Sequence, residues 1–100
     1  MDPDLSDFMI ADVVEAIAGR EKGQWYYVIA ANDEFLFLAN GKDRSLEQPK
    51  RKKRKHAKKV LRSETRVAEK LRAGDKVLNS ELRRDLAYLS QNTQSNAIGG

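Results

Sequence analysis

The pattern of hydrophobic residues changes near the middle of the chain. Residues 8–39 contain short apolar runs separated by turn signals, which is typical of β-strands. We predict strands within residues 8–17, 24–31 and 34–39. The second is the clearest, because its aromatic and β-branched residues follow one another directly. Turns are predicted where glycine, asparagine and aspartate interrupt the runs, at residues 19–23, 32–33 and 40–41.

The central predicted strand is apolar on both of its faces. Its alternating residues are Trp25, Tyr27 and Ile29 on one face, and Tyr26, Val28 and Ala30 on the other. A sheet with one solvated face would alternate apolar with polar residues. The pattern therefore indicates a small, tightly curved barrel or a sheet with something packed on its second face. We favour the barrel, because short strands with closely spaced turns are typical of one. We also expect a lysine-bearing edge strand near residues 55–61.

Residues 63–89 follow the period of α-helices. Ser63 is predicted to cap a first helix and Gly74 to end it. Asn79 is predicted to cap a second helix, whose apolar stripe consists of Leu82, Leu86 and Leu89. Helices this short need a packing surface. We therefore predict one small mainly β domain, residues 8–62, followed by a two-helix extension, residues 63–90.

The two ends of the chain are polar. We predict that the acidic residues 1–7 are flexible and that residues 91–100, which have almost nothing apolar to bury, form a disordered tail. The N-terminus lacks the basic start and long apolar stretch of a secretory signal. No apolar run approaches the roughly 20 residues that cross a bilayer. We expect a soluble cytoplasmic protein without a membrane partner.

Charge is concentrated in one segment. We call residues 50–62 the basic run: nine of its 13 residues are Lys or Arg and none is acidic. The rest of the chain holds ten basic and 15 acidic residues, a formal charge of −5. So dense a positive charge repels itself unless solvent or a polyanion compensates it. Nucleic acid is the first partner to consider, because each phosphate that Lys or Arg neutralises releases a counterion.

The chain offers little for catalysis or metal binding. It has no cysteine, so it has neither a disulfide framework nor a thiolate metal site. His56 is the only histidine, and no Ser, His and Asp set or phosphate-binding glycine loop is evident. We expect a non-enzymatic protein without a metal or cofactor.

Residues 12–29 resemble a KOW motif, in which a strand, a turn ending in glycine and a hydrophobic strand follow one another. Gly23 matches the characteristic glycine, and the similarity extends over roughly residues 10–61 into the basic run. The chain is similar to small bacterial KOW-domain proteins and to KOW-containing large-subunit ribosomal proteins of archaea and eukaryotes. The resemblance implies an SH3-like β-barrel that binds RNA, most directly ribosomal RNA. KOW domains of transcription elongation factors also contact proteins.

Candidate RNA-binding residues lie in the turn, in the loop after residue 41 and in the basic run. They are Arg20, Lys22, Gly23, Lys42, Arg44, Lys50, Arg51, Lys52, Lys53, Arg54, Lys55, His56, Lys58 and Lys59. Gly23 serves backbone geometry or offers its N–H to a phosphate. Arg20 and Lys22 are solvated charges or phosphate contacts, and Arg44 contacts RNA or pairs with Asp43.

Trp25, Tyr26 and Tyr27 have two interpretations. They could stack on bases beside the basic run, or pack in the core, which we favour. We expect Phe35 and Phe37 to be core residues too.

The function that we expect is binding of structured ribosomal RNA or the ribosome, in assembly or translation. The alternative is a KOW protein-interaction module of the transcription or translation machinery. DNA stays a third possibility, because contacts to phosphates do not distinguish the two nucleic acids.

Overall fold

The computed structural model describes the backbone of residues 7–99 and the side chains of residues 7–92. The predicted flexible N-terminus therefore lies, apart from Asp7, outside the described residues, as does Gly100. Five strands, one 3₁₀ turn and two helices follow one another along the chain. They are β1 (Asp12–Ala16), β2 (Trp25–Ala31), β3 (Phe35–Ala39), β4 (Lys50–Lys53), η2 (Arg54–His56), β5 (Ala57–Arg62), α1 (Arg66–Ala73) and α2 (Asn79–Gly99).

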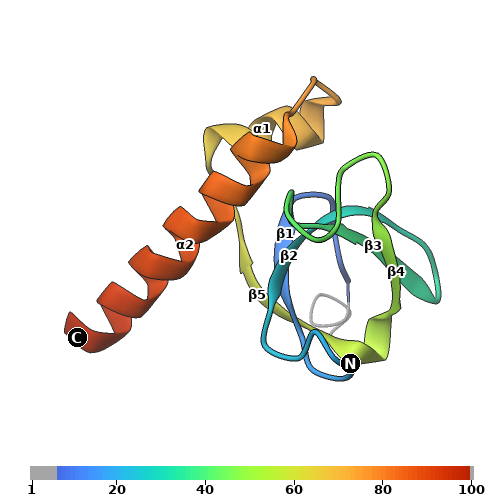
Figure 1. Cartoon of the computed structure of the whole chain (residues 1–100), viewed down its shortest axis with the longest axis horizontal. Coiled ribbons are helices and arrows are strands. Elements are labelled where there is room, and N and C mark those ends of the chain that lie inside the picture. Colours follow the sequence, from blue (N-terminus) through green and yellow to red (C-terminus); the bar gives the residue numbers. More distant parts are fainter. Residues whose placement is uncertain (1–6, 100) are drawn as a thin grey trace.

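The strands form one antiparallel sheet in the order β4-β3-β2-β1-β5. The two edge strands, β4 and β5, are joined by only the three residues of η2. The sheet must therefore curl until its edges approach each other, as Figure 1 shows. Within the described chain, β4 and β5 do not pair with each other. The prediction of a mainly β domain followed by two helices is confirmed, with a curled sheet rather than a closed barrel.

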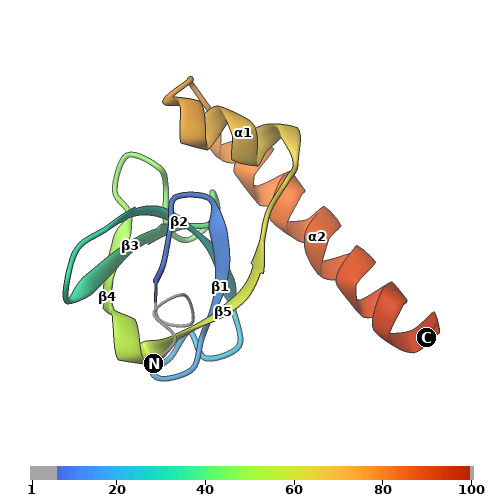
Figure 2. The same ribbon diagram turned by 180° about the vertical axis from the view of Figure 1, so that it is seen from behind.

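Both faces of the sheet are buried over its central strands, as the apolarity of residues 25–30 predicted. The inner face of the curl holds a cluster built from the sheet alone: Val14, Ala16, Tyr26, Val28, Leu36, Leu38 and Ala57. On the outer face, Val13, Tyr27 and Ala39 pack against Leu82 and Leu86 of the second helix. Figures 1 and 2 show both helices outside the curl, on the side of β1, β2 and β5.

The first helix begins later than the sequence predicted. Thr65, not Ser63, is its N-cap, and the Thr65 Oγ1 accepts the N–H of Ala68 at 3.2 Å. Ser63 is buried and its hydroxyl binds Tyr27, so it is occupied elsewhere. Gly74 ends the helix in the left-handed conformation, with φ of 76°, as predicted.

The second helix starts at Asn79 and carries the predicted stripe, with Leu82 and Leu86 buried and Leu89 packed beside them. Its backbone stays helical to Gly99, where the sequence predicted a disordered tail from residue 91. Each residue added to an existing helix fixes fewer backbone dihedral angles per hydrogen bond than the first turn does. Polar residues can therefore continue the helix.

Gly41 allows the loop of residues 40–49 to dock on the start of α2. Its φ is 76°, and a Cβ there would lie 2.1 Å from the carbonyl oxygen of Asn79. Only glycine fits so close an approach. The Asn79 Oδ1 accepts the N–H of Leu46 at 2.8 Å, and its Nδ2 donates to Glu47 at 2.9 Å. Asn79 therefore clamps the loop, and the prediction that it caps the second helix is wrong: it is the first helical residue, and its Oδ1 is occupied by Leu46.

Candidate nucleic-acid interface

The turn between β1 and β2 is shaped by Gly23, as the sequence predicted. Its φ is 94°, and a Cβ would meet nothing within 4 Å, so the constraint is the backbone conformation alone. The Gly23 N–H donates to the Ala16 carbonyl at 2.8 Å. That N–H is therefore used inside the turn and does not point at a ligand. Arg20 and Lys22 are exposed on the same turn.

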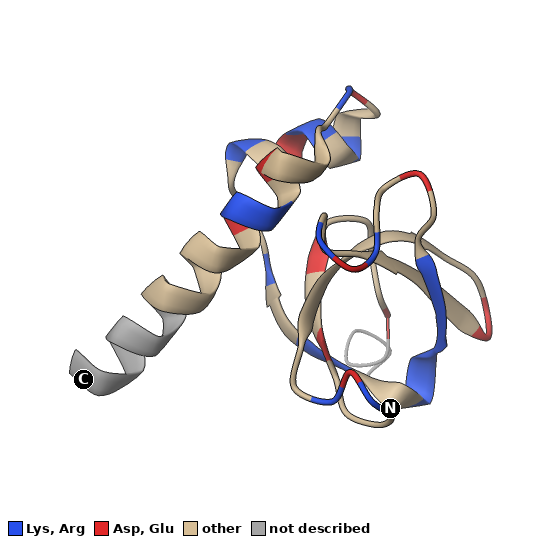
Figure 3. Ribbon diagram, in the orientation of Figure 1, with Lys and Arg blue, Asp and Glu red and all other residues tan. Residues whose placement is uncertain are grey.

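The basic run forms the two edge strands of the sheet and the 3₁₀ turn between them. The prediction of an edge strand near residues 55–61 is confirmed by β5, whereas β4 was not predicted. Figure 3 shows β4 and the start of η2 as one continuous stretch of Lys and Arg. Side chains alternate between the two faces of a strand, so the sheet sorts these cations into an inner and an outer set.

Lys50 and Lys52 lie on the inner face, opposite Leu38 and Leu36 of β3. Lys50 Nζ lies 3.2 Å from the Glu21 carboxylate. Lys52, only 8% exposed, donates to the Ala18 carbonyl at 3.1 Å and lies 3.6 Å from Glu21. The Lys50 hydrogen bond lowers the pKa of Glu21, which keeps this carboxylate ionised. These contacts hold the turn of residues 17–24 against β4.

Lys59 also faces inward, opposite Val14. Its Nζ lies 3.2 Å from the carboxylate of Asp12, which is 1% exposed, and donates to the Asp7 carbonyl at 2.6 Å. A carboxylate this deep requires a compensating charge. We call Lys50, Lys52 and Lys59 the paired cations, because their charges are compensated inside the molecule.

Arg54 and His56 shape η2. The Arg54 guanidinium donates to the Asn32 carbonyl at 2.7 Å and lies 5.2 Å from the ring centroid of Phe8. The carbonyl of His56, a half-buried residue, accepts the N–H of Ile17 at 3.0 Å. Both residues fasten the connection between the two edge strands to neighbouring loops.

Four cations of the run are exposed: Arg51, Lys53 and Lys58 on the outer face of the strands, and Lys55 in η2. We call these four the exposed cations. Among the described residues, none of the four takes part in an ion pair. Lys58 stands opposite the half-buried Glu15 of β1. Arg62, the last cation of the run, is exposed but lies 3.9 Å from Glu64. The exposed cations are therefore the part of the run that is free to meet a polyanion.

Lys42 and Arg44 belong to a different loop. Both are exposed, and their backbone N–H groups donate to the Asn40 Oδ1 at 2.9 and 3.0 Å. Within the described chain, the considered pair between Arg44 and Asp43 does not form. The structure therefore joins the turn of residues 19–23 to the basic run through Glu21, and the loop of residues 40–49 to α2 through Asn79.

The aromatic residues of β2 lie where the sequence favoured them, whereas the prediction that Phe35 and Phe37 are core residues is wrong. Tyr26 and Tyr27 are fully buried, and Trp25 packs against the outer cluster, so these three are core residues, as favoured. Phe35 and Phe37 are only half-buried and belong to neither core cluster. They lie on the outer face of β3, opposite Lys53 and Arg51. Their place on the outer face depends on the register of the strands, which neighbouring residues in the sequence do not reveal.

A buried network of hydroxyls fastens the helices to the sheet. The Tyr27 hydroxyl donates its one proton to the Asp85 carboxylate, and its oxygen lies 2.8 Å from the Ser63 hydroxyl oxygen. The Asp85 carboxylate also accepts the Thr65 hydroxyl at 2.8 Å. Burial, reinforced by Asp85, raises the pKa of Tyr27 to about 12. Tyr27 therefore stays protonated at neutral pH and acts as a structural donor.

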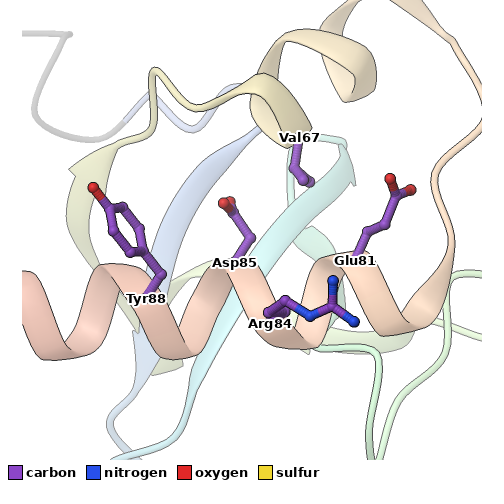
Figure 4. Close-up of a pocket in the computed structure, with 5 residues that line it drawn as sticks. All are labelled: Val67, Glu81, Arg84, Asp85 and Tyr88. Atoms are coloured by element: carbon purple, nitrogen blue, oxygen red, sulfur yellow. The ribbon is translucent and has the colours of Figure 1, made fainter.

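A cavity of about 360 Å³ lies between the two helices (Figure 4). Val67 of α1 and four residues of α2 line it: Glu81, Arg84, Asp85 and Tyr88. Asp85 is already held by Tyr27 and Thr65, so it is poorly placed to act as a general base. Across residues 7–92, no group of three or more His, Asp or Glu side chains is placed to hold a metal ion. No helix in the described part of the chain is long and apolar enough to cross a membrane.

No protein-family model matches this chain, and a search of curated proteins finds no significant match.

Proposed function

We propose that this chain is a non-catalytic, cytoplasmic RNA-binding protein of KOW type, which binds structured ribosomal RNA during ribosome assembly or translation. The observation that carries the proposal is the set of exposed cations, Arg51, Lys53, Lys55 and Lys58, which lack an ion pair within residues 7–92. Aligned positive charge without internal compensation favours a partner with regularly spaced negative charge.

The form of the sheet supports the same proposal. A small antiparallel sheet whose edge strands are joined by the three residues of η2 suits the SH3-like barrel that the KOW resemblance implies. Arg51, Lys53 and Lys58 lie on edge strands and Lys55 on the turn between them, where the backbone is fastened on one side only and the surface is open to a large ligand. Phosphate contacts of this kind position a nucleic acid without reading its bases.

Co-sedimentation with ribosomal particles tests the proposal. The variant replaces Arg51, Lys53, Lys55 and Lys58 with Gln. The matched control replaces four exposed cations of the helical part and changes the net charge equally: Arg66, Lys76, Arg83 and Arg84. We expect the first variant to lose sedimentation and the control to keep it. In-cell crosslinking of wild type then identifies the bound RNA, and competition with matched DNA tests the sugar.

The second candidate function is a protein-interaction module of the transcription or translation machinery. Tyr88 favours it, because this residue is 57% exposed beside the cavity between the helices. Aromatic residues placed this way are common at protein interfaces. If the control variant loses sedimentation while the variant of the exposed cations keeps it, this second function replaces the first.

A further inference from the structure

The helices leave part of the outer face of the sheet uncovered. The outer cluster joins β1, β2 and β5 to α1 and α2, and from β3 it includes only Ala39. Phe35 and Phe37 lie beyond this cluster on the same face of β3. Figures 1 and 2 show the helices on the opposite side of the curl from β4. The surface of β3 and β4 is therefore an open strip with half-buried aromatic side chains.

Cations alternate with the aromatic rings on this strip. The register places Phe37 opposite Arg51 and Phe35 opposite Lys53. Residues directly opposite each other in an antiparallel pair share a face and lie in contact. Each aromatic ring of the strip therefore has an exposed cation beside it, which combines an apolar surface with positive charge.

Arg51 lies over an aromatic ring of the strip. Its guanidinium carbon lies 4.5 Å from the centroid of the Phe35 ring, while the residue as a whole is exposed. Within the described residues, no hydrogen bond or ion pair holds this guanidinium. A guanidinium whose one side faces a ring leaves its other side open to a base. The contact with the ring also restricts the side chain before a ligand binds.

A hollow suited to a phosphate adjoins the stack. It has a volume of about 280 Å³ and is lined by Lys53, Arg54, Lys55 and Glu34. Lys53 belongs both to this hollow and to the strip beside Phe35. Arg54 is engaged with Asn32, so Lys53 and Lys55 are the cations that we assign to the anion. The single carboxylate, Glu34, leaves the balance of charge positive.

We propose that this strip binds an unpaired RNA segment, with one base stacked on the Arg51–Phe35 pair and a neighbouring phosphate between Lys53 and Lys55. The inference rests on the proposed RNA-binding function and narrows it to single-stranded nucleotides. Bases in an A-form duplex are stacked on each other and cannot reach such a platform, whereas bases of loops and bulges can. The backbone phosphates supply affinity, and the stacked plane supplies the preference for an exposed base.

Fluorescence anisotropy with two probes tests this inference. One probe is a single-stranded RNA of about 12 nucleotides, and the other has the same length and charge but abasic central positions. We expect wild type to bind the intact probe at least about tenfold more tightly. Arg51→Lys keeps the charge but removes the plane, so it should abolish this preference without changing the affinity for the abasic probe. Phe35→Leu should have the same effect.

Arg62→Lys is the matched control, because it makes the same change at an exposed arginine outside the strip, and it should alter neither affinity. Equal binding of the two probes by wild type, or a preference that survives Arg51→Lys, overturns the inference. If a duplex RNA still binds in that case, the proposed function stands without it. If no RNA probe binds, the proposed function fails as well. Melting temperatures of all variants establish that each protein is folded.

Discussion

The inner and outer faces of the edge strands β4 and β5 carry the same residue types for different purposes. On the inner face, Lys52 and Lys59 meet a carbonyl, Glu21 and the buried Asp12. On the outer face, Arg51 lies over the Phe35 ring and Lys53 stands opposite Phe35, and neither takes part in an ion pair among the described residues. Charge density alone therefore does not identify a binding surface. A cation contributes to the fold where the molecule supplies its counter-charge, and to binding where it does not.

The outer face is itself divided. Under the helices its polar groups are satisfied internally, as Tyr27 shows with Ser63 and Asp85. Beside the helices, on β3 and β4, it is open. We therefore expect changes on the inner face and under the helices to lower stability, and changes on the open strip to lower RNA affinity.

The largest effect should come from replacing the exposed cations with Gln. At about 0.1 M salt each lost phosphate contact removes a factor of roughly eight, so the loss of all four should lower duplex RNA affinity by up to about 4 × 10³. The slope of log affinity against log salt should become shallower by about 3 to 4. Binding measured across a salt series checks both values. An unchanged slope would show that the outer face does not contact phosphates, and a lowered melting temperature would show that these cations also serve the fold.

The pH dependence of stability tests the role of Tyr27 on the part of the outer face that the helices cover. Its pKa is about 12 in the fold, against about 10 for tyrosine in an unfolded chain. The protonated hydroxyl therefore contributes stability that is fully present below pH 10 and is lost as pH rises from 10 to 12. That loss amounts to about 2–3 kcal/mol.

Denaturant unfolding from pH 7 to 12 measures this effect. Tyr27→Phe should be less stable at pH 7, because Asp85 loses a donor, and its deficit should shrink between pH 10 and 12. Tyr88→Phe, at a 57% exposed position, is the control and should follow wild type throughout. A constant deficit across this range would contradict the assigned role of the hydroxyl.

Lys59 tests the inner face. Replacing it with Met leaves the buried Asp12 carboxylate without its ion-pair partner, and we expect a loss of about 1–3 kcal/mol in the free energy of unfolding. RNA affinity of the folded protein should stay at the wild-type value. Lys58→Met, one residue away on the outer face, should show the reverse pattern. If both variants behave alike, the two faces do not differ as the structure indicates.

The smallest effect on RNA affinity should come from Glu21, which pairs with Lys50 and Lys52 of the inner set. Glu21→Gln removes a negative charge beside Lys50 and Lys52, so it should raise RNA affinity about two- to threefold at low salt. Because Lys52 is only 8% exposed and loses its carboxylate partner, the melting temperature should also fall. Glu69→Gln, on the exposed surface of α1, serves as the control for net charge. A reduced affinity would mean that Glu21 holds the interface in shape.

Local signals in the sequence were sufficient for much of the fold. Consecutive aromatic and β-branched residues predicted β2, and the leucine stripe predicted the buried face of α2. Gly23 and Gly74 marked positions of positive φ that few other residues tolerate. These features depend on neighbours within a few residues, which is why a single chain reveals them.

Non-local partners were needed for the rest. Lysine is a poor strand former, and β4 exists because β3 supplies its hydrogen bonds. The sequence predicted Ser63 as a helix cap, but its hydroxyl is bound by Tyr27, which lies 36 residues away in the chain. The sequence predicted Phe35 and Phe37 as core residues, but the helices cover the outer face over β1, β2 and β5 and leave these two residues of β3 uncovered.

The chain alone therefore specified one cationic segment in an otherwise acidic chain, a mainly β region before it and two helices after it, the second with a buried leucine stripe. It did not specify which cations of that segment are available to a ligand. Side chains alternate from face to face along a strand, and a shift of one residue in the pairing of β4 with β3 would exchange Lys52 with Arg51. That register depends on hydrogen bonds between distant segments, so it exists only in the folded molecule. It divides one run of positive charge into an inner set that holds the fold and an outer set that we propose binds RNA.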